Sequence, residues 1–463
     1  MNQRIILLAA ALLSCVACWP SAAEAKSKKP HTGPKDIFGL TNIWTIHLRF
    51  SREQWEAMAP KVSLPPGRNA GASFLQGPEG ARNGVAASLF GITFNYVHAD
   101  LEFGTNRFKD VGVRYKGNGT YLSSRELLKR SLKVDLNQFE KGQKLAGMSQ
   151  FNLHNSVRDP TGMNEAIAYG LFREGKVPAP RTAYAKVYLT VPGQHEREYL
   201  GLYNMVEDVG SAFVKEQLGG SGGALMKPVT PSLFAYLGDD WKKYNQAYDP
   251  KGAMTEKEQR RVIEFCKVSS RASDAEFAAK LGDYIDIDNF ARYMGLTAWL
   301  SDLDGILGPG QNFYLYLHPK TQKFMFIPWD QDQTFGQFPR GTDEQRENLN
   351  IHKPWTGNNA FLAKVFKCAS FKTAYLAALR EFNGTILDPK RIERQVNELA
   401  AVVRGPIQEE SAARLAALNK AVAGHAVRID MGPGFPADTQ VKPIKAFVPA
   451  RAKSVTAQLA GKS

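Results

Sequence analysis

Four side chains with oxygen ligands lie within one short stretch of the chain, residues 299–336. Carboxylate and amide oxygens are the ligands that Mg²⁺ prefers, and a hard cation held by them keeps coordination positions open for phosphate. An acidic residue beside glycine or proline can instead cap a turn, so a metal site requires that several of these side chains converge. The four are Asp304, Asn312, Asp330 and Asp332.

A predicted β-hairpin would bring these side chains together. Residues 312–318 and 323–329 are apolar and aromatic enough for strands, and residues 319–322 between them have the composition of a turn. Antiparallel pairing about this turn puts Asp330 opposite Gln311 and Asn312, with Asp304 on the loop that leads into the first strand. The sequence therefore predicts a magnesium site at one end of the hairpin.

Strand patterns dominate the first part of the chain and helical patterns the second. A helix is predicted over residues 163–174, because Met163, Ile167 and Leu171 recur every fourth residue. This order predicts an α+β protein with two lobes and a cleft between them. The predicted strands are residues 41–50, 99–103, 110–115, 131–136, 149–154, 183–190 and 198–206, and the later helices include residues 255–269, 287–300, 392–403 and 407–423.

Length and composition agree with two lobes. A chain of 463 residues with 43% hydrophobic and 22% charged residues can bury a large core. The expected organisation is a β-rich N-lobe over residues 41–226, a helical C-lobe with the metal-binding hairpin over residues 227–430, and a C-terminal tail over residues 431–463.

The N-terminus predicts export. Residues 1–25 have a basic start at Arg4, an apolar run and an A-x-A pattern around Glu24, which is typical of a secretory signal peptide cleaved before Lys26. Lipidation at Cys15 is the alternative. Residues 26–40 are expected to be a flexible leader, and no later run is long enough for a membrane helix. The mature protein is therefore expected in the periplasm or outside the cell.

Charge and motifs exclude several classes of protein. The formal net charge of +14 favours anionic partners, but no basic stripe interleaved with aromatic residues indicates nucleic acid. No HExxH motif is present, and histidines such as His154 are single residues on strands, so a zinc site is not expected. Cys266 and Cys368 could form a disulfide or simply be buried apolar side chains.

Several separate motifs carry a resemblance to a known family. In order they are residues 113–119 (VRYKGNG), 130–136 (RSLKVDL), 201–208 (GLYNMVED) and 328–336 (PWDQDQTFG). Together they resemble the CotH kinase family of spore-coat and secreted bacterial proteins. The resemblance implies an atypical bilobal protein-kinase-like fold with an antiparallel sheet N-lobe crossed by one helix and a mostly helical C-lobe. It also implies phosphate transfer from ATP to protein side chains.

For the N-lobe, the resemblance implies residues that contact the nucleotide. A short glycine loop would cradle the triphosphate, although a tight hairpin turn explains the same residues. Lys133 would pair with phosphate and Glu165 would hold that lysine, and Glu207, with Asp208, would touch adenine or ribose. Each of these side chains also has an ordinary explanation. Lys133 could lie on an exposed strand face, Glu165 could complement the helix dipole, and Asp208 could start the next helix. The loop residues are Gly117, Asn118 and Gly119.

For the C-lobe, the resemblance implies the metal and the acceptor groups. Asp304 would orient the acceptor hydroxyl, Asn312 would bind the metal, and Asp330 would be the principal Mg²⁺ carboxylate. The spacing of eight residues from Asp304 to Asn312 (312 − 304) is longer than in common kinases. Two questions therefore stay open: whether Asp302 replaces Asp304, and whether Asp332 binds a second metal.

The function that follows is an exported phosphotransferase that uses ATP and Mg²⁺ and acts on hydroxyl groups of a secreted or cell-envelope protein. One alternative is a non-catalytic protein of coat or envelope assembly that keeps a kinase-like fold and binds an anionic polymer or an acidic protein. Another is transfer of AMP in place of phosphate.

Overall fold

The computed structural model describes residues 33–62, 92–220, 222–432, 435–436 and 438–462. The predicted signal peptide and residues 26–32 of the predicted leader lie outside this part of the chain. Among the described residues, no helix combines the length and the apolar character needed to cross a membrane.

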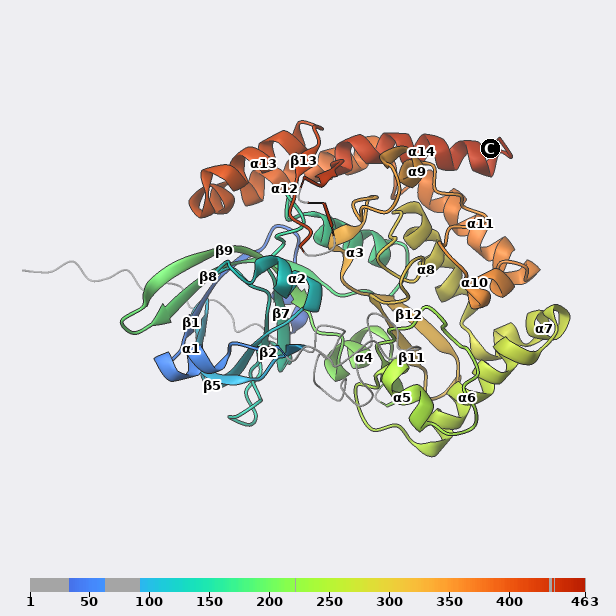
Figure 1. Ribbon diagram of the computed structural model, residues 1–463, viewed down its shortest axis with the longest axis horizontal. Helices are drawn as coiled ribbons and strands as arrows, with labels where there is room; N and C mark the ends of the chain where they lie inside the picture. The colour runs from blue at the N-terminus through green and yellow to red at the C-terminus, as the bar shows by residue number, and fades with distance from the viewer. Residues whose placement is uncertain (1–32, 63–91, 221, 433–434, 437, 463) are drawn as a thin grey trace, which may run out of the picture.

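Seven strands close into a barrel, which lies on one side of the molecule (Figure 1). All seven strands predicted from the sequence are present. Side chains alternate between the barrel interior and the surface, as in β4, where every second residue is buried. In order around the barrel the strands are β1 (Ile43–Arg49), β4 (Val97–Phe103), β5 (Asn106–Tyr115), β6 (Leu132–Asp135), β7 (Gln150–His154), β9 (His195–Glu207) and β8 (Thr182–Val191).

Closure of this sheet corrects the predicted fold. An open antiparallel sheet, as in a kinase N-lobe, was expected, but β1 and β8 pair in parallel from Ile43 opposite Tyr184 to Arg49 opposite Thr190. Every other neighbouring pair in the barrel is antiparallel. The parallel pair joins the two edges that an open sheet would leave exposed. The mixed α+β class is confirmed, and the sheet itself is a barrel.

Helices build the other side of the molecule around a second hydrophobic core. At its centre, α8 (Ile287–Trp299) is buried at every residue from Asn289 to Trp299. Beside it lies a three-stranded sheet of β10 (Ala224–Met226), β11 (Phe313–Leu317) and β12 (Phe324–Pro328). The surrounding helices are α4 (Ser211–Gln217), α5 (Lys242–Tyr248), α6 (Glu256–Arg271), α7 (Asp274–Tyr284), α9 (Asp343–Glu347), α10 (Ala360–Val365), α11 (Ala369–Asn383), α12 (Pro389–Glu410), α13 (Ala412–Val422) and α14 (Ile444–Leu459).

The helix predicted to cross the barrel sheet belongs to the helical core. α3 (Asn164–Glu174) is buried from Asn164 to Phe172, and its apolar side chains pack with those of the helical side of the molecule. The two cores therefore do not divide the chain at a single point. α14 also packs in the helical core. Cys266 and Cys368, the two cysteines in the part of the chain that the structure describes, are buried free thiols.

The C-terminal helices run along the barrel and the helical side (Figure 1). A helix break at Gly405-Pro406 was expected and is wrong, because α12 continues through Pro406 and ends at Glu410. Tyr199 of β9 donates its hydroxyl hydrogen to the Pro406 carbonyl at 3.0 Å. Contact with the barrel thus outweighs the local cost of proline.

Glu410 anchors α12 to the barrel. Its carboxylate accepts a hydrogen bond from the Leu202 N–H at 3.0 Å and pairs with Lys129 Nζ at 2.7 Å. Gly201 has φ of +121°, and a Cβ there would lie 2.5 Å from Glu410 Oε2, so only glycine leaves room for this carboxylate. Burial lowers the pKa of Lys129 to about 8 even with this partner.

We expect Glu410→Gln to lower the free energy of unfolding by about 2 to 4 kcal/mol, because it leaves a buried ammonium without a counter-charge. Urea unfolding at pH 7 measures the loss. Glu409→Gln is the matched control, since Glu409 pairs with Lys186 at the surface with 53% of its side chain exposed. Equal losses for the two variants would contradict the prediction.

Candidate functional site

The predicted hairpin is confirmed, and it brings Asn312 beside Asp330. β11 and β12 pair with Phe313 opposite Pro328, and the Trp329 N–H donates to the Asn312 carbonyl at 3.1 Å. Asn312 and Asp330 have φ of +61° and +57°. Asn and Asp tolerate this left-handed backbone better than other side chains do, and such strain is concentrated at functional sites.

The N-terminus of α3 docks onto the end of this hairpin. Tyr169 accepts a hydrogen bond from the Asp330 N–H at 2.9 Å, and Asn164 Nδ2 donates to the Asp332 carbonyl at 2.9 Å. Asp159 caps the helix by accepting the Asn164 N–H at 2.8 Å. Glu165, in the first turn, therefore faces the segment that contains Asp330 and Asp332.

Four carboxylates converge there, and we call Glu165, Asp304, Asp330 and Asp332 the acidic cluster. Burial raises the pKa of Asp332 well above its usual range, and the charges of Asp330, Glu165 and Asp304 raise it further. Burial and the charges of Asp302 and Asp330 raise the pKa of Asp304 to about 7. Ligand atoms of Glu165, Asp330 and the neighbouring His154 all lie within 4.8 Å of one another. A divalent cation would relieve this repulsion, so the cluster fits Mg²⁺.

Asp304 and Asn312 contact each other at the edge of the cluster. Asn312 Nδ2 donates to Asp304 Oδ2 at 3.2 Å and to the Asp304 carbonyl at 3.1 Å, and Gln311 Nε2 donates to Asp304 Oδ1 at 2.9 Å. The amide nitrogen of Asn312 is therefore turned toward Asp304, which leaves its Oδ1 atom as the possible metal ligand.

Asp302, the alternative to Asp304, lies deeper. It is 2% exposed, and its Oδ2 atom accepts a hydrogen bond from Gln331 Nε2 at 3.2 Å. Burial raises the pKa of Asp302 to about 7. This carboxylate supports the loop, whereas the half-buried Asp304 is the better candidate to meet a substrate.

The raised pKa of Asp302 predicts a pH dependence of stability. Between pH 4 and pH 7 the folded chain binds more protons at Asp302 than the unfolded chain does, so the ligand-free protein loses stability as pH rises through this window. Asp302→Asn should remove that contribution and raise the free energy of unfolding by about 1 to 3 kcal/mol at pH 8, with little change at pH 4. Urea unfolding with EDTA at both pH values measures this, and an equal effect at the two values would contradict it.

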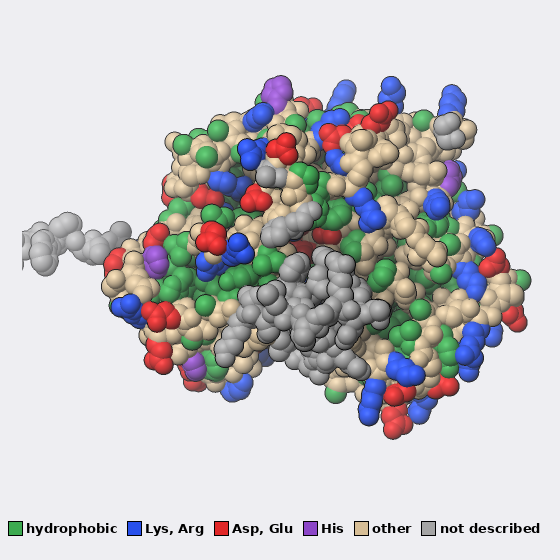
Figure 2. Space-filling view, viewed as in Figure 1, with side chains coloured by type: hydrophobic (Ala, Val, Ile, Leu, Met, Phe, Trp, Pro, Cys, Tyr) green, Lys and Arg blue, Asp and Glu red, His purple; other side chains and the backbone are tan. Residues whose placement is uncertain are grey.

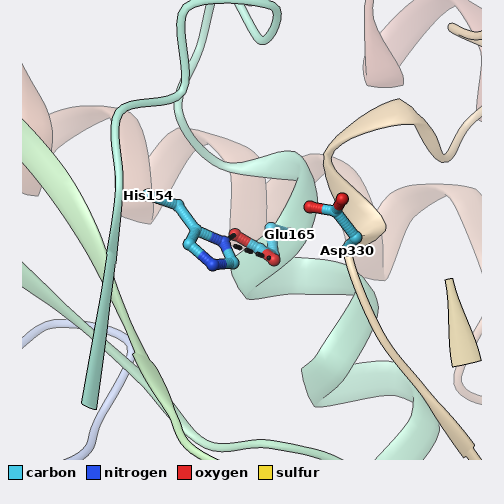
Figure 3. Close-up of side chains that lie close together, drawn as sticks. All are labelled: His154, Glu165 and Asp330. Atoms are coloured by element: carbon cyan, nitrogen blue, oxygen red, sulfur yellow. Dashed lines mark hydrogen bonds and ion pairs between the residues drawn. The ribbon is translucent and has the colours of Figure 1, made fainter. Parts of the chain in front are cut away.

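A lysine, a histidine and a glutamate form a chain of hydrogen bonds beside the cluster. His154, the last residue of β7, points its Nδ1 atom at the Glu165 carboxylate, 2.8 Å from Oε2 (Figure 3). Lys116 Nζ contacts the other ring nitrogen, Nε2, and lies 5.0 Å from the centre of the Trp329 ring. Burial lowers the pKa of Lys116 to about 8, although Asp330 and Glu165 oppose this shift.

Neither Lys116 nor His154 was predicted to act here. Lys116 directly precedes Gly117, and His154 is a single histidine on a predicted strand, so neither residue stands out in the sequence. A usable signal exists: His154 ends its strand shortly before the helix that carries Glu165, so the connection is short enough to bring them together.

Lys133 has a different partner from the one predicted. It pairs with Asp208 at 2.8 Å, and Asn152 Nδ2 donates to the same carboxylate oxygen at 3.1 Å. The expected pairing of Lys133 with Glu165 is therefore wrong, and Glu165 faces His154 instead. The charge of Lys133 lowers the pKa of Asp208 despite burial.

Glu207 faces Arg181. Its carboxylate accepts from the Arg181 backbone N–H and from Nε, each at 3.0 Å, and from Gln217 Nε2 at 3.0 Å. With 2% exposure and these partners, Glu207 supports the segment leading out of β9. Asp208 is the better candidate of the two to contact a ligand.

The predicted glycine loop is the start of a helix. α2 (Asn118–Ser124) begins directly after Gly117, which has φ of +79°, so the alternative of a tight hairpin turn is wrong. A Cβ on Gly119 would lie 3.1 Å from the guanidinium of Arg158, which donates to Ser123 Oγ. Burial raises the pKa of both Asp304 and Asp332, and the charge of Arg158 partly opposes this rise, so Arg158 is a cation close to the acidic cluster that the sequence did not reveal.

Two adjoining cavities open onto these residues. The smaller, about 80 Å³, is lined by Lys116, His154, Glu165, Asp330 and Asp332 among others. The larger, about 420 Å³, lies between the barrel and the helical side and is lined by the strand-end residues 207–212 and by five basic side chains. Lys116, Lys227 and Trp329 line both cavities. The five basic residues are Arg114, Lys116, Lys133, Lys227 and Lys251.

The comparisons with known proteins agree with this arrangement of motifs. The family described as CotH kinase protein matches residues 113–454, which is most of the chain and includes every residue of the acidic cluster. The protein therefore belongs to the CotH family. A curated relative is the inner spore coat protein H of Bacillus subtilis (strain 168), which is 20% identical over 289 residues, covering 61% of this chain and 74% of that protein.

Proposed function

We propose that this protein is an exported, Mg²⁺-dependent phosphotransferase that moves phosphate from ATP to a hydroxyl group of a protein, on an atypical kinase-like architecture. The observation that carries the proposal is the convergence of three carboxylates, those of Glu165, Asp330 and Asp332, and of Lys116 on the smaller cavity, with Lys116 also lining the larger one. Phosphoryl transfer needs these parts: a metal site, a cation for phosphate and a carboxylate near the acceptor.

Asp330 and Asp332 would hold the metal ion, with Asn312 Oδ1 as a further ligand. When bound, Mg²⁺ would neutralise the phosphate charge and polarise the phosphorus–oxygen bond. The chain prepares this site by fixing Asp330 through its backbone N–H on Tyr169 and by fixing Asp332 through its carbonyl on Asn164.

The larger cavity would take the nucleoside and the smaller one the phosphates. A volume of about 420 Å³ lies within the usual range for small-molecule sites. The Trp329 ring lines both cavities, and Lys116 and Lys227 lie over this ring where phosphates would pass. Asp304, at the edge of the acidic cluster, would orient the acceptor hydroxyl.

The place of action follows from the predicted signal peptide and from the name of the relative, which is a coat protein. We infer an exported protein of the coat or envelope whose acceptor is a neighbouring protein. The same name favours the alternative of a non-catalytic assembly protein. Figure 2 shows basic side chains scattered among acidic ones on the visible face, and no single basic patch there favours an anionic polymer.

Two measurements test the proposal. Mg²⁺-ATP should raise the melting temperature of the purified mature protein, and ATP labelled at the γ-phosphate should transfer label to the protein itself or to an envelope protein fraction. Mass spectrometry of the acceptor distinguishes phosphate from AMP. Absence of both stabilisation and transfer would contradict the proposal and favour the assembly protein.

A further inference from the structure

An imidazole separates the lysine of this site from its glutamate. Lys116 Nζ contacts His154 at Nε2. The Nδ1 atom of the same ring faces Glu165, at 3.0 Å from Oε1 and 2.8 Å from Oε2 (Figure 3). A lysine and a glutamate in direct contact would form a closed ion pair. Here Lys116, which follows β5, His154 of β7 and Glu165 of α3 form a chain of hydrogen bonds instead.

The chemistry of the partners selects one form of the imidazole. An ammonium group has donors and no acceptor, so His154 Nε2 must accept from Lys116. An ionised carboxylate only accepts, so His154 Nδ1 must carry the hydrogen and donate it to Glu165. His154 is therefore a neutral imidazole with its hydrogen on Nδ1.

The surroundings hold this line of side chains in place. Glu165 is 0% exposed and His154 is 7% exposed. The His154 ring stands edge-on to Trp329 with ring centres 5.8 Å apart, and Lys116 lies over the same indole ring at 5.0 Å. A rotation of the imidazole would break both hydrogen bonds within a buried site, which is costly.

The electrostatic result differs from that of a direct pair. The ring places Glu165 at roughly twice the distance from Lys116 that a contact ion pair would have, which about halves the Coulomb attraction between them. The neutral imidazole fixes the direction of the Lys116 ammonium group without adding a negative charge beside it. The positive charge of Lys116 is therefore less fully offset by Glu165, and it attracts another anion more strongly. Lys116 lines both cavities.

We propose that His154 is a positioning residue: as a neutral imidazole oriented by Glu165, it directs the Lys116 ammonium onto the phosphates of the nucleotide. This inference rests on the proposed function, and it makes Lys116 the phosphate-binding lysine. Lys133, held by Asp208, serves the larger cavity.

The first test reads the imidazole directly in the ligand-free protein. Histidine labelled with ¹⁵N should show His154 as one neutral tautomer with hydrogen on Nδ1 at pH 7, assigned by the signal that disappears in His154→Asn. Lys116→Met should disturb this tautomer, because Nε2 loses its donor. A hydrogen on Nε2, or no response to Lys116→Met, would overturn the contact on which the proposal depends.

The second test asks whether His154 acts through Lys116. Calorimetry of Mg²⁺-ATP and of adenosine is compared for wild type, His154→Asn, Lys116→Met and the double variant, with the exposed His352→Asn as control. Each single change should weaken Mg²⁺-ATP binding about tenfold or more while leaving adenosine unchanged, as expected when a hydrogen bond to a charged group is lost. The double variant should bind no more weakly than Lys116→Met.

The outcomes separate this inference from the proposed function. If His154→Asn weakens binding by the same factor when Lys116 is already replaced, or weakens ATP and adenosine equally, His154 is only structural and the inference is overturned. If the wild type binds no nucleotide, the proposed function fails together with the phosphate role of Lys116, while the tautomer measurement still decides whether the hydrogen-bonded line exists.

Discussion

Replacing Asp330 by Asn is expected to reduce transfer of phosphate from Mg²⁺-ATP by at least about a thousandfold and to abolish stabilisation by the metal–nucleotide complex. Asp330 is the carboxylate whose charge acts on Asp302, Asp304 and Asp332 at once, so it stands at the centre of the proposed metal site. Losing a metal ligand removes an interaction that the transition state needs more than the ground state does.

The same variant should leave the ligand-free fold at least as stable as the wild type. Asn tolerates the left-handed backbone at this position, which has φ of +57°. It also removes a charge that three neighbouring acids repel and that Lys116 attracts, so the free energy of unfolding in EDTA should stay equal or rise by about 1 kcal/mol. Lost transfer together with lost stability would mean a structural role and would contradict the assignment.

Asp283→Asn provides the control for both measurements. Asp283 is exposed in α7 and does not line either cavity. Its replacement removes the same charge as Asp330→Asn and should change neither transfer nor stability. If Asp330→Asn transfers phosphate as the wild type does, the metal assignment is wrong.

The second large effect is expected at Arg451 of α14. Its side chain is 0% exposed, and its guanidinium donates to four backbone carbonyls, two of them in the last turn of α8. Helix C-termini leave carbonyls without partners and favour a cation. Burial lowers the pKa of Arg451 to about 10. The carbonyls therefore take the place of water as hydrogen-bond acceptors for the guanidinium. The four carbonyls are those of Ala298, Trp299, Glu347 and Leu349.

Arg451→Met should lower the free energy of unfolding by about 3 to 5 kcal/mol, because four backbone carbonyls lose a buried charged donor, although those of Ala298 and Leu349 keep a second donor. Since α8 ends immediately before the loop that contains Asp302 and Asp304, the surviving folded protein should also bind Mg²⁺-ATP more weakly. Urea unfolding and calorimetry measure the two effects. Lys453→Met, an exposed change on the same helix, should cost less than about 0.5 kcal/mol, and a similar loss in both variants would contradict the prediction.

Local patterns predicted much of this fold correctly. The seven barrel strands and the hairpin at Asp330 are specified by apolar alternation, turn composition and β-branched or aromatic residues within short windows. The placement of Asp330 beside Asn312 follows from the turn alone, since one turn fixes the pairing of both strands.

Long-range features could not be predicted in the same way. The parallel pairing of β1 with β8 joins segments far apart in sequence, and nothing in either strand's alternation distinguishes an open sheet from a closed one. α12 continues through Pro406, whose carbonyl accepts a hydrogen bond from Tyr199 of the barrel. Local helix propensities do not include such a long-range contact. Helix continuity there is decided by tertiary packing.

The same difference between local patterns and long-range contacts applies to the candidate site. The residue types of the acidic cluster were recognisable because acids cluster around one hairpin. Lys116, His154 and Arg158 were missed, since a single basic residue becomes informative only when the fold brings it against a distant carboxylate. The partner of Lys133 was misassigned for the same reason.

The burial of α3 among the helices rather than in the barrel has a mechanical consequence. A switch that worked by swinging this helix outward would have to expose most of its length, including Ile167 and Phe172, and would be too costly for regulation. Glu165 therefore keeps a fixed position on the helical side of the molecule. Because His154 ends a barrel strand, its hydrogen bond to Glu165 joins the barrel to the helical side at the candidate site.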